Sequence, residues 1–278
     1  MWTERVALPS GVELALRRWP GDGRAFVLVH GLASNARLWD GVAEALSRAG
    51  RPVVAVDQRG HGLSDKPEIG YDMATVADDL ALLVAALGLA GPVLAGQSWG
   101  GNVVLEAAFR HPGMVSAVAL VDGGWLHLGD HFSAWEECAE ALKPPALEGL
   151  PLSRLEAAIR IGHPDWPESG IQATLANFEV RADGTIRPWL TLEHHLAILR
   201  SLWEHEPRTR YPAIGVPVLL CPADPDHEAA ARRFDQQALV DEAAAALPAA
   251  RVRWFRPSDH DIHAQHPEAL ADALLELV

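Results

Sequence analysis

The chain has 278 residues, of which 49% are hydrophobic and 22% are charged, and it carries a formal net charge of −14 at pH 7. This length and composition fit one large globular domain, with or without an insertion, and exclude a disordered or fibrous protein. The negative charge argues against nucleic acid and anionic membrane surfaces as partners, because both require a basic face.

The number of cysteines and the length of the apolar runs indicate where in the cell the protein is expected to lie. Cys138 and Cys221 are too few and too far apart in sequence to suggest a disulfide framework or a zinc site. The N-terminus leads into alternating strand residues without the apolar core of a signal peptide, and no apolar run is long enough to span a bilayer. We therefore expect a cytoplasmic protein that does not interact with membranes.

Strands and helices alternate in the first half of the chain. Residues 4 to 19 predict two short strands around a turn, and the apolar runs that follow predict strands buried on both faces. The expected strands span about 25–29, 52–56, 92–95 and 116–121, and the expected helices span about 38–49, 75–87 and 102–110. Such alternation predicts an α/β fold with a mostly parallel sheet and helices on both faces.

The alternation breaks at residues 125–212, where several prolines interrupt helical patches at 135–142 and 190–203. We interpret this stretch as a helical cap inserted into a core formed by residues 1–124 and 213–278. The expected elements after it are a strand at 216–221, a helix at about 225–247, a strand at 251–255 and a helix at about 267–277.

A short motif, Gly96-Gln97-Ser98-Trp99-Gly100, joins a predicted strand to a predicted helix. This G-x-S-x-G pattern is typical of a nucleophile elbow, in which a serine stands at the apex of a strained turn and small residues let the backbone close. Ser98 would point its hydroxyl out of the sheet, and the helix N-terminus would offer amide donors to an anion at the same place. The alternative is a Gly-Ser loop that only turns the chain.

Three other stretches join the elbow in a fixed order along the chain. They are His30-Gly31, the stretch from Asp57 to Ser64, and a histidine close to the C-terminus. In this order the chain resembles an α/β-hydrolase over nearly its whole length apart from the middle insertion. The resemblance implies a serine hydrolase whose oxyanion hole is formed by the backbone amides of Leu32 and Trp99. We interpret the His30 imidazole and the stretch from Asp57 to Ser64 as structural.

The general base must be chosen from 13 histidines. The family places its base between the last strand and the last helix, and usually has a proline several residues beyond it. Pro267 stands at that distance from His260, which we therefore expect to take the Ser98 proton. His263 and His266 in the same loop are the alternatives.

The acid of the triad has two possible positions. Most family members place it after the strand predicted at 216–221, where Asp224 and Asp226 are candidates and Asp226 fits the usual spacing better. Both aspartates are also explained as the cap and first turn of the following helix. A minority of α/β-hydrolases, including zearalenone-lactonase-like enzymes, place the acid at the end of the preceding strand, where Asp122 precedes two glycines. We expect Asp122 to be the acid, with Asp226 as the main alternative.

Half of the ten tryptophans lie in the expected cap. Most of them would form the cap's own small core, and one or two, such as Trp125 and Trp189, would face the substrate because ligand pockets have apolar and aromatic walls. The other three are Trp135, Trp166 and Trp203.

These features predict a serine hydrolase that cleaves a medium-sized hydrophobic ester or lactone. A serine nucleophile disfavours epoxide hydrolase and dehalogenase chemistry, which need a carboxylate at that position. We expect no metal and no cofactor, because the histidines lack an H-E-x-x-H motif and there is no glycine-rich phosphate loop. The alternatives are cleavage of a carbon–carbon bond or of an N-terminal peptide bond, and a ligand receptor that has kept a hydrolase pocket. The sequence does not indicate an oligomeric state.

Overall fold

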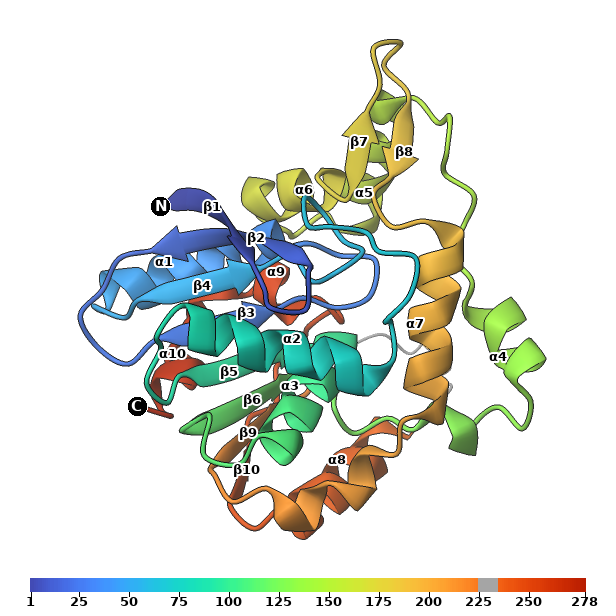
Figure 1. Cartoon of the computed structure of the whole chain (residues 1–278). Helices are drawn as coiled ribbons and strands as arrows, with labels where there is room; N and C mark the ends of the chain where they lie inside the picture. Colours follow the sequence, from blue (N-terminus) through green and yellow to red (C-terminus); the bar gives the residue numbers. More distant parts are fainter. Residues whose placement is uncertain (225–234) are drawn as a thin grey trace.

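The protein is built on one eight-stranded sheet, which Figure 1 shows in a computed structural model that describes residues 1–224 and 235–278. The strands follow the order β1-β2-β4-β3-β5-β6-β9-β10. Their bounds are β1 Trp2–Ala7, β2 Glu13–Trp19, β3 Phe26–Val29, β4 Val53–Val56, β5 Val93–Gln97, β6 Ala117–Val121, β9 Val218–Cys221 and β10 Ala250–Val252. All neighbouring pairs from β4 to β10 are parallel, and β1–β2 and β2–β4 are antiparallel. The prediction of a mostly parallel sheet is confirmed.

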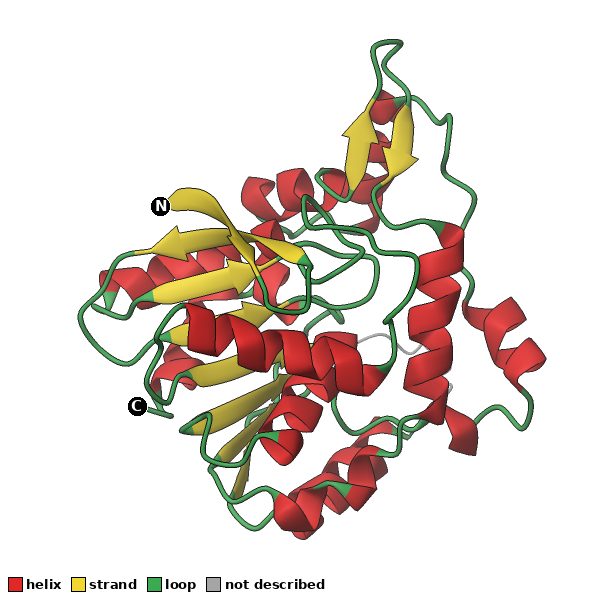
Figure 2. Ribbon diagram, in the orientation of Figure 1, coloured by secondary structure: helices red, strands yellow, loops and turns green. Residues whose placement is uncertain are grey.

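Helices cover both faces of this sheet (Figure 2). They are η1 Ala36–Trp39, α1 Asp40–Arg48, α2 Met73–Ala86, α3 Trp99–Arg110, α8 Gln236–Ala246, α9 Ile262–Gln265 and α10 Pro267–Leu275. Alternate residues of β3 point to opposite faces: Val27 packs with α2, α3 and α8 in one apolar cluster, and Leu28 packs with α1 and α10 in another. Every residue of β3, β4, β5, β6 and β9 is buried, which explains their continuous apolar sequences.

The 125–212 segment lies outside the large sheet. Its elements are η2 Leu128–Asp130, α4 Trp135–Leu142, α5 Leu152–Gly162, α6 Glu168–Leu175, β7 Phe178–Val180, β8 Ile186–Pro188, α7 Leu192–Glu204 and η3 Pro207–Thr209, and η4 Tyr211–Ala213 runs across its end. The helical patches expected at 135–142 and 190–203 correspond to α4 and α7. The sequence did not predict α5, α6 or the antiparallel hairpin β7–β8, which projects at the top of Figure 2.

The last part of the chain differs from expectation in two places. Helix α8 begins at Gln236, after the non-helical residue Asp235, whose side chain accepts a hydrogen bond from the Ala238 amide. Of the helix expected at about 225–247, the structure shows Gln236–Ala246, and residues 225–234 lie outside the described part of the chain. The strand expected at 251–255 is the shorter β10, at the edge of the sheet. Among the described residues, no helix is both long and apolar enough to cross a membrane.

Candidate active site

Ser98 stands at a strained junction between β5 and α3. Its φ of 54° and ψ of −124° lie outside the regions that residues with a side chain ordinarily adopt. The surrounding packing holds this geometry: a Cβ at Gly96 would lie 2.1 Å from the Gly100 oxygen, and a Cβ at Gly100 would lie 2.5 Å from the Val29 oxygen. Only glycines let the turn close this tightly, and such strain is typical of functional sites.

The end of β6 lies directly beside this turn. The Ser98 amide donates to the Val121 oxygen at 2.9 Å, and a Cβ at Gly123 would lie 2.0 Å from the Ser98 oxygen. Asp122, between Val121 and Gly123, itself has a positive φ of 44°. The backbone thus turns sharply at both strand ends and leaves the Asp122 side chain next to the elbow.

The Asp122 carboxylate joins the sheet to the loop that contains His260. One oxygen, Oδ1, accepts hydrogen bonds from the Ala223 amide at 2.9 Å and from Gln236 Nε2 at 2.5 Å. The other oxygen, Oδ2, lies 2.5 Å from His260 Nδ1. Because a carboxylate only accepts, Nδ1 carries the proton, and Nε2 of the neutral ring is left to accept another. The Asp122 side chain is only 8% exposed.

The surroundings of His260 favour its protonated form. Desolvation by the protein lowers the pKa of this histidine, but the hydrogen bond and the charge of Asp122, together with the charge of Asp261, outweigh it and raise the pKa to about 9. The His260 side chain is 54% exposed, so water screens part of this attraction. A base with a raised pKa is a stronger proton acceptor, and it needs a higher pH to be neutral.

The other described candidates for the acid and the base make different contacts. Asp224 forms an ion pair with Arg256, with 2.7 Å between its Oδ2 and Nε, and Asp226 lies outside the described residues. The His263 ring is buried against Trp39, and burial lowers its pKa to about 3. His266 Nε2 lies 3.0 Å from the Pro257 oxygen.

The loop that follows β3 approaches Ser98 from the other side. A Cβ at Gly31 would lie 2.5 Å from Gln97 Oε1 and 3.0 Å from Ser98 Cβ, so the loop packs directly on the elbow. Leu32, the next residue, is half-buried. The chain thus brings the Leu32 segment and the first turn of α3, which begins at Trp99, to the two sides of Ser98.

Two histidines hold this loop in place. His30 Nε2 accepts from the Gln58 amide at 3.1 Å, and the Gln58 side chain donates to the His30 oxygen at 2.7 Å. His61 Nε2 accepts from the Ala33 amide at 3.2 Å, and its ring stacks on Trp99 at 5.5 Å. Burial lowers the pKa of both histidines, so they brace the loop as neutral rings.

Two glutamines at the site were not singled out from the sequence. Gln97 donates from Nε2 to the His260 oxygen at 3.2 Å, so it connects the elbow to the histidine loop. Gln236 binds the Asp122 carboxylate and also the Ala223 oxygen at 3.2 Å. The place of Gln97 inside the elbow motif was a usable signal, whereas Gln236 stands in an ordinary helical sequence and gave none.

The tryptophans of the 125–212 segment have different surroundings. Trp125 is buried in the large apolar cluster on the α2–α3 face of the sheet. Trp189 lines a cleft and lies under the Lys66 ammonium at 5.3 Å. Trp135 and Trp203 pack on each other at 6.3 Å, and Trp166 donates to Asp259 at 3.1 Å. In the described part of the chain, no group of histidine, cysteine, aspartate and glutamate side chains could hold a metal ion.

Comparison with known proteins points to one fold. A family model described as alpha/beta hydrolase fold matches residues 24–156. The solved structure of E-2-(acetamidomethylene)succinate hydrolase superposes with a TM-score of 0.82 at 23% identity, over 99% of this chain and 98% of that one. At this identity the likeness concerns the fold.

Curated relatives match over shorter stretches. The 2-(acetamidomethylene)succinate hydrolase of Mesorhizobium japonicum is 32% identical over 177 residues, which are 62% of this chain and 60% of the relative. The non-heme chloroperoxidase of Streptomyces lividans is 40% identical over 118 residues, which are 42% of this chain and 43% of the relative. The chain thus matches less than two thirds of the length of either relative.

Proposed function

The chain has the α/β-hydrolase fold, and on this premise we propose that it is a serine hydrolase that cleaves a carboxylic ester or lactone. Fold alone does not assign a reaction, so the proposal rests on the side chains at the elbow. The observation that carries it is the hydrogen bond of 2.5 Å between Asp122 and His260, made beside a serine held in a strained turn.

The proposed reaction runs through an acyl-enzyme. Ser98 Oγ attacks the substrate carbonyl while His260 Nε2 takes its proton, and the amides of Leu32 and Trp99 donate to the resulting oxyanion. His260 then returns the proton to the leaving oxygen, and water releases the acid by the same steps. Asp122 holds the ring with Nδ1 protonated and stabilises the imidazolium.

We also propose that the 125–212 segment covers Ser98 as a cap. Leu32 packs against the apolar cluster that contains Leu128 and Leu199, so η2 and α7 lie over the proposed oxyanion loop. On the opposite side, the His163 and Trp166 rings each lie 3.1 Å from the Asp259 carboxylate, next to His260. A cover held at both sides of the elbow would exclude water and supply apolar walls, with Trp125 and Trp189 as candidate contacts.

Active-site labelling with a fluorophosphonate tests the nucleophile. We expect one label per chain by intact-mass measurement, located at Ser98, and none in Ser98→Ala. We also expect p-nitrophenyl esters of medium apolar acids to be cleaved faster than charged ones. Labelling at another serine, or turnover retained in Ser98→Ala, would overturn this mechanism and favour the ligand-receptor alternative.

Hydrolysis of an amide is the second candidate function. It is favoured by the likeness to 2-(acetamidomethylene)succinate hydrolase, whose name describes an acetamido compound. The same serine, histidine and amide donors serve both reactions, because each passes through a tetrahedral oxyanion. Turnover of matched p-nitrophenyl acetate and p-nitroacetanilide distinguishes them, since an amide hydrolase retains substantial activity on the anilide.

A further inference from the structure

A cleft of about 800 Å³ lies between the β1–β2 hairpin and the 125–212 segment. Arg5 and Leu16 belong to its sheet side, and Leu175, Phe178 and Trp189 belong to its other side. Ser98, Asp122 and His260 are not among its lining residues. Its volume falls within the range of small-molecule sites, so the cleft is large enough for a ligand of its own.

Much of the cleft wall is apolar and open to solvent. Leu63 is 62% exposed and Val180 is 50% exposed, and both line the cleft. Phe178, Trp189 and Leu152 are half-buried at the same wall. An apolar ligand in this position would remove these side chains from water, which is favourable by about 25 cal/mol for each Å² buried.

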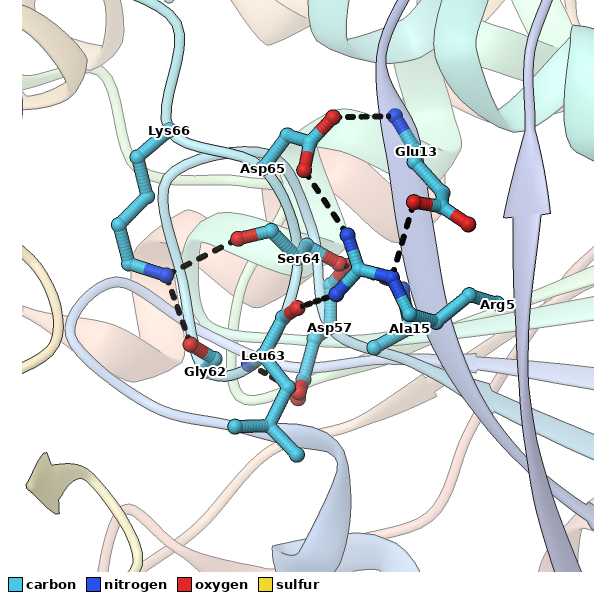
Figure 3. Close-up of polar contacts among 9 residues, drawn as sticks. All are labelled: Arg5, Glu13, Ala15, Asp57, Gly62, Leu63, Ser64, Asp65 and Lys66. Carbon is cyan, nitrogen blue, oxygen red and sulfur yellow. Dashed lines mark hydrogen bonds and ion pairs between the residues drawn. The ribbon is translucent and has the colours of Figure 1, made fainter.

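Two of the three arginines that line the cleft are already neutralised. Arg5 lies between two carboxylates, at 3.0 Å from Glu13 and 2.9 Å from Asp65, and it also donates to the Leu63 oxygen (Figure 3). Arg17 donates to both oxygens of Asp40, at 2.6 and 2.7 Å. These contacts fix the sheet side of the cleft and leave little positive charge there.

The third arginine, Arg37, is exposed, and its guanidinium has no hydrogen bond or ion pair within the described residues. Lys66 lies nearby, with its ammonium over the Trp189 ring. Its ammonium donates to the carbonyl oxygens of Gly62 and Ser64, at 2.8 and 2.9 Å (Figure 3), and forms no ion pair within 4.0 Å in the described chain.

The charges of Asp57 and Asp65 act on Lys66, so Arg37 is the cation of this cleft that has no ion pair among the described residues. In a chain of net charge −14, an exposed guanidinium beside an apolar wall favours an anionic ligand.

We propose that this cleft binds a small amphipathic carboxylate. Its carboxylate would pair with Arg37, whose planar guanidinium suits two-point binding, and its apolar body would lie on Phe178, Leu175 and Trp189. The proposal does not depend on the proposed catalytic activity, because binding here requires neither Ser98 nor His260.

The cleft is connected to the proposed oxyanion loop through the backbone. Asn35 and Asp57 line the cleft, and the Asp57 carboxylate accepts from the Ala36 amide at 2.8 Å. Asn35, three residues after Leu32, donates to the Ala173 oxygen at 2.8 Å. A carboxylate in the cleft therefore comes from one of two sources: it is the remote part of a substrate, or it is a separate effector that acts through this loop.

Calorimetric titration with decanoate tests the site. We expect Arg37→Gln to weaken decanoate binding about fivefold, the effect of losing one solvent-accessible ion pair of about 1 kcal/mol. The matched control is Arg24→Gln, since Arg24 is also exposed but lies outside the cleft, and it should bind as the unchanged protein does. Decanol, which has no carboxylate, should bind with the same affinity to the unchanged protein and to both variants. Equal decanoate affinities in Arg37→Gln and Arg24→Gln would overturn the proposal.

Filling the cleft gives an independent test. Ala176 lines the cleft at the end of α6 with ordinary helical backbone angles, so Ala176→Trp adds a large ring without backbone strain. We expect this variant to lose decanoate and decanol binding while its melting temperature stays close to that of Ala176→Ser. Unchanged decanoate binding in Ala176→Trp would show that the ligand binds elsewhere and would contradict the proposal that the cleft is its site.

Kinetics with a p-nitrophenyl ester identify the source of the carboxylate. Competitive inhibition by decanoate, with KM raised and kcat unchanged, identifies the cleft as the substrate's own subsite when Arg37→Gln weakens the inhibition and Arg24→Gln does not. A change of kcat at saturating ester identifies a separate effector site. If the protein has no esterase activity, the calorimetric comparison still decides whether the cleft binds, so the two proposals fail independently.

Discussion

The ends of β5 and β6 differ from the 125–212 segment in how their positions are held. At the strand ends, Ser98 and Asp122 have positive φ angles, and backbone atoms approach so closely that no side chain fits at Gly123. In the 125–212 segment the apolar clusters are small, and partly exposed ion pairs such as Arg160 with Glu156 join the surface. Groups that react need rigid placement, whereas groups that select a substrate tolerate variation.

The largest effect is expected from Asp122→Asn at the strand end. The amide keeps the shape of the side chain but removes the charge that stabilises imidazolium and the correct tautomer. We expect turnover to fall by up to about 10⁴-fold, measured as kcat on an activated ester.

Asp224→Asn is the control for this change. It removes the charge that pairs with Arg256, and turnover should stay within a few-fold of normal. Near-normal turnover in Asp122→Asn would contradict the assignment of the acid. The same substitution at Asp226, which lies outside the described residues, would then be the next measurement.

Adding a methyl group to one glycine should destabilise the protein at the strand ends but not in the 125–212 segment. Gly123→Ala places a Cβ 2.0 Å from the Ser98 oxygen, so the strand ends must move apart. We expect a loss of about 1–3 kcal/mol in the free energy of unfolding, as for other overpacked sites, together with reduced turnover.

Gly162→Ala in the 125–212 segment is the matched control. A Cβ at Gly162 meets nothing within 4 Å, at the last residue of α5. Urea unfolding should show unchanged or slightly raised stability, because alanine is the better helix former. Equal losses in both variants would mean that the elbow is no more tightly packed than the segment.

The pH dependence should report the contact between Asp122 and His260. Only neutral His260 accepts the Ser98 proton, and its pKa is raised to about 9, so kcat/KM should keep rising above pH 7. In Asp122→Asn the midpoint should move to lower pH. An unchanged midpoint in this variant would indicate that another group controls the profile.

The same contact affects stability with a definite sign. Because folding raises the pKa of His260, its contribution to stability is fully present below pH 6.5 and is lost as pH rises through about 9. The melting temperature should therefore fall over this window more in the unchanged protein than in Asp122→Asn.

The smallest effect is expected from Arg160→Gln on the surface of the 125–212 segment. Arg160 pairs with Glu156 and Glu168 at 2.7 Å, but the group is exposed, and such pairs contribute little to stability. We expect unchanged turnover and a melting temperature indistinguishable from that of the unchanged protein. A large loss of activity in Arg160→Gln would contradict this contrast, because it would mean that the 125–212 segment tolerates as little change as the strand ends.

The sequence by itself determined the features that depend on neighbouring residues. Continuous apolar runs predicted the buried strands, and the glycines around Ser98 predicted the sharp turn between β5 and α3. These signals are local, because a strand buried on both faces and a tight turn each limit the residue types at their own positions. The assignment of catalytic functions to Ser98 and His260 stays a prediction.

Only the tertiary structure decided which side chains meet at the strand ends. Asp122 and His260 are 138 residues apart, and their contact depends on β6 lying between β5 and β9. Gln236 reaches Asp122 from a helix whose sequence carries no motif. The hairpin β7–β8 and the cleft beside it likewise arise from packing between distant segments. Pairings of this kind depend on strand order and on the shape of the packed surface, which no local pattern encodes.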